Sequence, residues 1–250
     1  MYDDLDRPPL RSSRLSRTLA PEGWRIEVLS ETGSTNAVVA QRARDGEPAG
    51  LVVVAETQTA GRGRLDRSWV SPPRSGLTFS VLLSPDLAPA RWGWLPLWAG
   101  TAVALALREQ TGLEVGLKWP NDVLVGGRKL GGLLAEVPVP GALVLGIGIN
   151  VTNRGEELPH DRATSLQVEG ASSTDRETLL KSVLRRLADQ LSARDPDGYR
   201  RLCLTLGQQV RVELPDGRSV EGRATSVDDA GRLVVDGVAF AAGDVVHLRA

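Results

Sequence analysis

The segment of residues 56–69, ETQTAGRGRLDRSW, combines fixed positive charge with glycine. Its small and basic residues are Gly61, Arg62, Gly63, Arg64 and Arg67. Glycine lets backbone amides approach a ligand that a side chain would block, and a planar guanidinium donates paired hydrogen bonds to phosphate. The pattern therefore predicts a loop that orders around a polyphosphate, with a flexible Arg-Gly surface loop that contacts RNA as the alternative.

A second polar cluster, Lys118-Trp-Pro-Asn-Asp122, lies between apolar segments and is followed by Arg128-Lys-Leu-Gly-Gly132. Trp, Pro, Asn and Asp in succession make a poor strand interior, so the chain is expected to turn sharply after Lys118. The cluster then places charges where a sheet opens into a pocket. The alternative is a pair of ordinary turn residues with solvated lysines at 118 and 129.

Two shorter segments also bear on ligand binding. Residues 31–36, ETGSTN, contain a helix start at Ser34 or Thr35. Hydroxyls and free amides at such a start suit a ureido or amide ligand, although a plain N-cap explains them equally well. In residues 146–151, GIGINV, glycines inside a strand predict the close approach of a ligand or of another backbone.

Several common chemistries are absent. The sequence has no Gly-x4-Gly-Lys-Ser/Thr phosphate loop, and no Gly-x-Gly-x-x-Gly follows a predicted strand. The two histidines, His160 and His247, lie in different regions, and with the single cysteine, Cys203, they do not make a zinc site.

Bulk composition indicates a cytoplasmic protein without a nucleic-acid or membrane partner. The formal charge is −1, from 30 basic and 31 acidic residues, which argues against binding nucleic acid by bulk electrostatics. One cysteine excludes an internal disulfide framework. The N-terminus is acidic and proline-containing, unlike a signal peptide. The most apolar segment, residues 92–107, is interrupted by glycine and proline and is shorter than the roughly 20 residues of a membrane span.

The hydrophobic pattern predicts an α+β fold for residues 23–204, because strands are grouped with few intervening helices. The expected strands are 51–55, 77–83, 122–125, 129–137 and 142–151, with a turn at 126–128. The expected helices are 34–44 and a buried helix over 95–110, followed by a helix that opens at a Thr174–Glu177 capping box and runs to Ala193.

The two ends of the chain differ from this central region. Residues 1–22 are rich in Arg, Ser, Pro and Asp and are expected to be a flexible tail, too short for a helix-turn-helix domain. Residues 205–250 are expected to form a small β-barrel domain, with strands at 209–214, 219–227, 232–235 and 245–248.

Taken together and in this order, the four polar segments resemble the biotin–protein ligase family, and specifically the monofunctional actinobacterial type that lacks a DNA-binding domain. The resemblance runs from about residue 24 to the C-terminus. It implies a catalytic domain related to class II aminoacyl-tRNA synthetases and biotin–lipoate ligases, with a mixed sheet and flanking helices, followed by an SH3-like domain. The implied activity joins biotin and ATP, with Mg²⁺, into biotinyl-AMP and pyrophosphate, and then transfers biotin to a lysine.

The resemblance also implies roles for individual residues. Ser34, Thr35, Gln58, Arg64 and Lys129 match residues that line the biotin site; Trp69 matches a residue beside the adenine; Lys118 matches one near the reacting carboxylate. Asn121 and Asp122 match residues near the nucleotide and its magnesium, which makes Asp122 the candidate metal ligand. The further candidate ligand-binding residues are Asn36, Gly61, Arg62, Gly63, Gly131, Gly132, Gly148 and Asn150. The catalytic candidates are Lys118, Arg64 and Asp122.

One position departs from the family pattern. The family commonly has glycine where this sequence has Asp66, and a carboxylate there puts the role of Arg67 in question. The implied acceptor is the biotin carboxyl carrier domain of an acetyl-CoA or acyl-CoA carboxylase or of pyruvate carboxylase. The protein is expected to be a monomer or weak homodimer. A lipoate- or octanoyl-transferring enzyme is the nearest alternative, and a biotin-sensing regulator or RNA-binding module is a more distant one.

Overall fold

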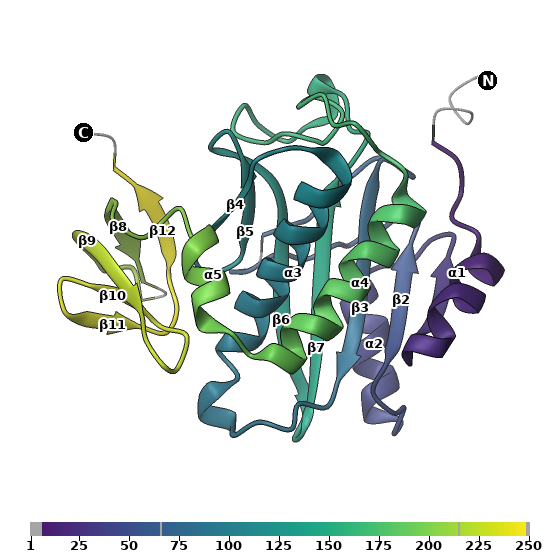
Figure 1. Ribbon diagram of the computed structural model, residues 1–250, viewed down its shortest axis with the longest axis horizontal. Helices are drawn as coiled ribbons and strands as arrows, with labels where there is room; N and C mark the ends of the chain where they lie inside the picture. The colour runs from purple at the N-terminus through teal and green to yellow at the C-terminus, as the bar shows by residue number, and fades with distance from the viewer. Residues whose placement is uncertain (1–6, 66, 215, 249–250) are drawn as a thin grey trace.

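The fold consists of a seven-stranded mixed sheet and a separate five-stranded antiparallel sheet (Figure 1). The computed structural model describes residues 7–65, 67–214 and 216–248. The large sheet has the order β1-β2-β3-β7-β6-β5-β4, and only β1 and β2 pair in parallel. Its strands are β1 Arg25–Leu29, β2 Leu51–Ala55, β3 Gly76–Leu83, β4 Val115–Lys118, β5 Asp122–Val125, β6 Arg128–Val139 and β7 Ala142–Asn150. The predicted α+β class is confirmed.

The central strands are buried on both faces, which explains their continuous apolar sequence. In β2, Val52 and Val54 belong to the main core, whereas Leu51 and Val53 pack in a second cluster with Val39. This second cluster lies under α2 (Thr35–Arg44), on the opposite face from α3 (Trp94–Thr111) and α4 (Arg176–Ala193). Helix α3 is apolar on nearly all sides because α4, the short α5 (Pro196–Leu202) and the sheet surround it.

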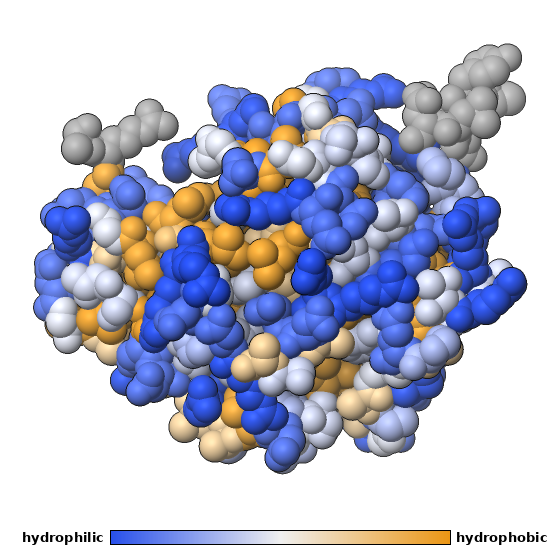
Figure 2. All heavy atoms as spheres, in the orientation of Figure 1, coloured by the Kyte–Doolittle hydropathy of each residue, from blue (hydrophilic) through white to orange (hydrophobic). Residues whose placement is uncertain are grey.

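The small sheet has the order β11-β10-β9-β8-β12. Its strands are β8 Gln209–Glu213, β9 Ser219–Val227, β10 Leu233–Val235, β11 Val238–Phe240 and β12 Asp244–His247. Two buried indoles dock it on the large domain: Trp94 Nε1 donates to the Asp229 carbonyl at 3.0 Å, and Trp119 Nε1 donates to that of Gly231 at 3.1 Å. Apolar side chains gather on the surface between the two sheets, whereas the side chains on the surface of α4 are mostly hydrophilic (Figure 2).

The expectation of a flexible tail over residues 1–22 is wrong for residues 7–22; residues 1–6 lie outside the described chain. Residues 12–19 form α1 (Ser12–Leu19), and a 3₁₀ turn (Ala20–Glu22) follows. Leu15 and Leu19 are fully buried against the main core. Two leucines four residues apart share one helix face, but in a segment this short and this rich in Arg and Ser the signal is weak.

Helix α4 begins one residue later than the capping-box pattern predicts. Asp175, not Thr174, is the N-cap, and its carboxylate accepts from the Glu177 backbone amide at 3.2 Å. The Glu177 carboxylate does not return to the helix start, because it accepts from the Arg11 backbone amide and Nε instead, both at 3.0 Å. A partner distant in sequence has replaced the local one.

Candidate functional site

The four polar segments converge on one cavity of about 1580 Å³ between the large sheet, its connecting loops and strand β12. The two long loops that contribute to it are the β2–β3 loop (residues 56–75) and the β7–α4 loop (residues 151–175). Fifteen of the predicted site residues line it: Ser34, Thr35, Asn36, Gln58, Arg62, Gly63, Arg64, Trp69, Lys118, Asn121, Asp122, Lys129, Gly132, Gly148 and Asn150. Gly61 and Gly131 are outside the lining, and Asp66 lies outside the described residues.

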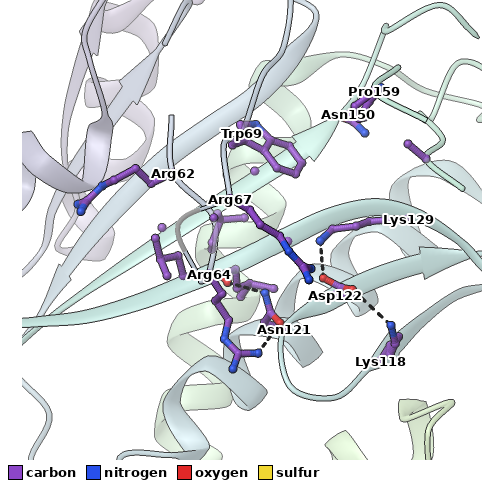
Figure 3. Close-up of a pocket in the computed structure, with 18 of the residues that line it drawn as sticks. Arg62, Arg64, Arg67, Trp69, Lys118, Asn121, Asp122, Lys129, Asn150 and Pro159 are labelled. Carbon is purple, nitrogen blue, oxygen red and sulfur yellow. Dashed lines mark hydrogen bonds and ion pairs between the residues drawn. The ribbon is translucent and has the colours of Figure 1, made fainter. Parts of the chain in front are cut away.

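Lys118, Asp122 and Lys129 form the charged centre of the cavity (Figure 3). Lys118 and Asp122 face each other across the β4–β5 hairpin, so the predicted turn after Lys118 is confirmed. Asp122 Oδ1 lies 2.6 Å from Lys129 Nζ, and Oδ2 lies 3.9 Å from Lys118 Nζ. Burial lowers the pKa of Lys118, Asp122 partly opposes this, and Lys129 adds to it. Two ammonium groups beside one carboxylate leave a net positive centre that suits an anion.

Arg62, Arg64 and Arg67 of the β2–β3 loop are held by different partners. Arg62 Nη2 pairs with Glu136 at 3.1 Å, and Arg67 pairs with Asp244 of β12. Arg64 Nη1 donates to Asn121 Oδ1 at 3.1 Å and to the carbonyl of Gly243 at 3.4 Å. Burial lowers the pKa of Arg64, and Asp244 and Asp122 oppose this, but an arginine stays charged throughout the physiological range. The structure therefore brings Arg64 to the charged centre, whereas Arg62 lies apart from it (Figure 3).

Away from the charged centre, uncharged side chains at the start of α2 line the cavity and form a hydrogen-bonded network. Gln58 Oε1 accepts from the Thr35 amide at 2.7 Å and from its hydroxyl at 3.1 Å. Ser80 Oγ lies 2.7 Å from Thr35 Oγ1 and 2.6 Å from Asn36 Oδ1. The Asn36 amide nitrogen donates to Glu136 at 2.6 Å. Because a carboxylate only accepts, Glu136 fixes which way the Asn36 amide points. Such a site offers both donors and acceptors to an uncharged polar ligand.

The glycines of β7 make room for two of these side chains. A Cβ at Gly146 would lie 2.2 Å from Asn36 Oδ1, and one at Gly148 would lie 2.6 Å from the Trp69 ring. The groups that approach these glycines in the structure are side chains, and not the ligand or the backbone that the sequence predicts. Close approach of a ligand at Gly148 stays a prediction. Trp69 Nε1 is buried without a hydrogen-bond partner among the described residues. A donor in that position is available to a ligand in the cavity.

The remaining predicted residues have structural contacts. Gly61 lies against the Trp69 carbonyl, which a Cβ added at Gly61 would approach to 2.4 Å. Gly131 lies against the Gly148 carbonyl, which a Cβ added at Gly131 would approach to 2.5 Å. Asn150 lines the cavity, but its amide donates to the Thr164 carbonyl at 2.9 Å and so holds the β7–α4 loop.

Sequence reasoning missed Ser80, Glu136, Asp244 and His247, all of which belong to the site or contact its residues. Segment 77–83 is apolar except for Thr78 and Ser80, so a hydroxyl in such a segment was the available signal for Ser80. For Asp244 and His247 there was none, because they come from the other sheet. His247 Nε2 lies 3.1 Å from Thr205 Oγ1, and burial, followed by the charge of Lys118, lowers the pKa of His247.

The carboxylates of the described residues do not form a metal cage of three or more ligands. The predicted metal ligand, Asp122, has both oxygens beside ammonium groups. Mg²⁺ that arrives on nucleotide phosphates needs only one or two protein carboxylates. The donor set therefore fits a magnesium–nucleotide substrate better than a resident ion.

Two family models match the chain. The biotin/lipoate A/B protein ligase family matches residues 28–152, and the biotin protein ligase C terminal domain matches residues 205–248. The fold and the site thus define a protein ligase of the biotin/lipoate type.

None of the helices in the described part of the chain has the length and apolar character of a membrane span.

Individual relatives narrow this class. The chain is 45% identical over 265 residues to the biotin--[acetyl-CoA-carboxylase] ligase of Mycobacterium tuberculosis, with 97% of each chain covered. The biotin protein ligase from Aquifex aeolicus in complex with biotin and ATP superposes with a TM-score of 0.76 and 30% identity, over 90% of this chain and 99% of that one. The biotin protein ligase from Leishmania major in complex with biotinyl-5-AMP superposes with a TM-score of 0.62 and 29% identity, over 90% of this chain and 98% of that one. The chain belongs to the biotin protein ligases of this family.

Proposed function

We propose that this chain is an ATP-dependent biotin–protein ligase that forms biotinyl-5′-AMP and then biotinylates a lysine. The observation that carries the proposal is the continuity of the cavity, whose neutral end at Thr35 and Gln58 suits a ureido ring and whose cationic end at Lys118 suits phosphate. A carboxylate attached to the ring by a short chain would then meet a nucleotide at the charged centre. The lipoate or octanoate alternative is not favoured, because the relatives reported above are biotin ligases.

In the first step a biotin carboxylate oxygen attacks the α-phosphorus of ATP, and the bond to the β-phosphate breaks to release pyrophosphate. A carboxylic acid with a pKa of about 4 is already ionised at neutral pH, so this step needs no general base. The difficulty is the repulsion between two anions. Lys118 and Arg64 reduce it by placing positive charge at the site of reaction and stabilise the departing pyrophosphate.

In the second step the acceptor amine attacks the acyl carbon and the bond to AMP breaks. At a pKa of about 10.4, only about one lysine in 2,500 is neutral at pH 7, so a group must remove a proton or lower that pKa. Asp122 is the candidate base, but in the structure its carboxylate lies beside two ammonium groups. It would have to leave one of them to accept the proton.

Mg²⁺ is proposed to enter as part of the magnesium–ATP substrate, and Asp122, the carboxylate of the charged centre, would be its protein ligand. The acceptor is proposed to be the biotin carboxyl carrier domain of a carboxylase, in line with the name of the Mycobacterium tuberculosis relative. Four further points stay predictions. They are the oligomeric state (monomer or weak homodimer), the cytoplasmic location, the domain limits 23–204 and 205–250, and the roles of the individual residues.

The direct test is pyrophosphate release from magnesium–ATP, with biotin and lipoate as parallel substrates. We expect release only with biotin. Release with lipoate alone would indicate a lipoate ligase. If folded protein released no pyrophosphate with either substrate, the proposed enzymatic function would be wrong.

Replacing Arg64 with glycine is expected to let biotinyl-AMP escape, so that lysines of unrelated proteins become labelled. The reason is that Arg64 ties the β2–β3 loop to Asn121 and to Gly243, and loop closure keeps the reactive anhydride from solvent. Streptavidin blotting of a non-acceptor protein such as albumin measures the effect. Arg44→Gly, at the end of α2 and outside the cavity lining, is the charge-matched control. Strict acceptor specificity in Arg64→Gly would contradict the role of the loop.

Adenylation is expected to lose rate at alkaline pH. Because the pKa of Lys118 is lowered, its ammonium loses its proton at a lower pH than an ordinary lysine, and the charge that offsets anion repulsion is lost as pH rises through that value. Transfer to the acceptor should show the opposite trend, since the amine becomes more nucleophilic. Pyrophosphate release measured without acceptor isolates the first step. Lys118→Arg keeps its charge, so its residual activity should lack the alkaline decline; an unchanged profile would exclude Lys118 as the cause.

A further inference from the structure

Residues 7–11, the N-terminal strap, run across the bases of both loops that line the cavity. The strap precedes α1 and lies at the purple end of the chain in Figure 1. Its residues are outside the cavity lining. All of its hydrogen bonds described below go to the ends of the β2–β3 and β7–α4 loops or to the start of α4.

Arg7 holds the start of the β7–α4 loop. Its guanidinium donates to the Thr152 carbonyl at 2.8 Å and to both carboxylate oxygens of Glu157, at 3.2 and 2.5 Å. Glu157 also accepts from the Arg154 backbone amide at 2.8 Å. Only 14% of the Arg7 side chain and 23% of that of Glu157 are exposed, so this pair is shielded more than an ordinary surface ion pair.

The middle of the strap holds the other end of that loop and the start of the β2–β3 loop. Arg176, the first residue of α4, donates to the Pro8 carbonyl and to Glu56 Oε2, both at 2.6 Å. The Leu10 amide donates to Glu56 Oε1 at 2.5 Å. Glu56 follows the last residue of β2 and is two residues before Gln58 of the cavity.

The two loop bases are also bonded to each other. The Arg74 amide donates to the Glu56 carbonyl at 2.9 Å, which closes the base of the β2–β3 loop. The Thr152 amide donates to the Ser75 carbonyl at 2.7 Å, which joins that base to the start of the β7–α4 loop. These backbone hydrogen bonds connect the bases of the two loops. Arg7 binds this connected region at the Thr152 carbonyl, and Glu56 belongs to it at the start of the β2–β3 loop.

We infer that the strap fixes the bases of both loops in the arrangement that the structure shows, and that Arg7, Glu56 and Arg176 are positioning residues for the retention of the activated intermediate. This inference rests on the proposed function for its ligand, but not for its loop mechanics. An intermediate held under two loops escapes only when they open, so its escape rate follows the opening equilibrium. Loss of charge-assisted bonds at one base is expected to raise that equilibrium about tenfold.

The test compares Arg7→Ala with Arg11→Ala. Both remove one charge from the strap, but the side chain of Arg11 bonds to Glu177 of α4. Its smaller electrostatic interaction with Asp175 lies at the far end of the β7–α4 loop from residues 151–158. We expect Arg7→Ala to speed amide hydrogen exchange about tenfold over residues 151–158, and to speed escape of biotinyl-AMP by a similar factor. Arg11→Ala should leave both unchanged, even where the two variants lose similar thermal stability. Arg7→Lys should restore part of the protection.

Equal exchange in the two alanine variants, or a loss of thermal stability in Arg7→Ala with normal exchange and normal escape, would overturn the inference. Hydrogen exchange is measured on the protein alone. It therefore tests the strap even if the wild-type chain releases no pyrophosphate with biotin, an outcome that would refute only the proposed function.

Discussion

Replacing Lys118 with glutamine is expected to slow biotin-dependent pyrophosphate release by about 10²–10³-fold, the usual effect of losing one preorganised charge-stabilising donor. Lys118 lies at the end of β4, beside Asp122 and with Lys129 across that carboxylate. Its charge matters most when the carboxylate approaches the α-phosphate. The neutral network at Thr35 and Gln58 is unaffected, so biotin binding measured by calorimetry without ATP should stay within about threefold of wild type, a change below 1 kcal/mol.

Lys181→Gln is the matched control, because Lys181 lies on α4 outside the cavity lining. Its rate should equal that of the wild type. A Lys118→Gln enzyme with nearly normal adenylation would show that Lys129 and Arg64 carry the electrostatic stabilisation without it. A variant that lost biotin affinity as strongly as rate would place Lys118 at the ring end of the cavity instead.

The sequence predicted the parts of the site that short motifs encode. The turn after Lys118 was predictable because Trp, Pro and Asn interrupt a strand, and the hairpin that follows places Asp122 opposite Lys118. The glycines at 146 and 148 were recognised as places of close approach, which the Asn36 and Trp69 side chains occupy. Local chemistry decides such features, so a single sequence carries them.

Contacts between distant segments were not predictable in the same way. Nothing near Asp244 marks it as a partner of Arg67, because the contact exists only after the small sheet docks through Trp94 and Trp119. Asp66, the residue of this loop that departs from the family pattern, lies outside the described residues.

The N-terminal segment illustrates a different limit. Its composition is that of a flexible tail, and composition measures how much apolar surface a segment can bury by itself. The described part is ordered by two leucines that enter an existing core and by hydrogen bonds to Glu56, Glu157 and Glu177. A contact with a distant residue also explains why the predicted capping box at the start of α4 does not form. Glu177 pairs with Arg11 and not with the backbone at the start of its own helix.

Replacing Arg176 with methionine is expected to lower the free energy of unfolding by about 3–5 kcal/mol, because it leaves the Glu56 carboxylate buried without its charged partner. The Arg176 and Glu56 side chains are only 5% and 8% exposed, and their atoms lie 2.6 Å apart. The substitution also removes the donors to the Pro8 and Gly76 carbonyls. Urea unfolding followed by circular dichroism measures the loss as a lower midpoint.

Arg186→Met on the same helix is the matched control. Arg186 pairs with Glu109 at 2.8 Å, but the two side chains are 41% and 51% exposed, so water screens the pair and its loss should cost about 0–1 kcal/mol. Combining Arg176→Met with Glu56→Met should recover part of the loss, since no buried charge is then left alone. If Arg176→Met and Arg186→Met shifted the midpoint equally, the Glu56–Arg176 pair would have no special place in the fold, and the anchoring of both loops would have to come from the backbone bonds between Ser75 and Thr152.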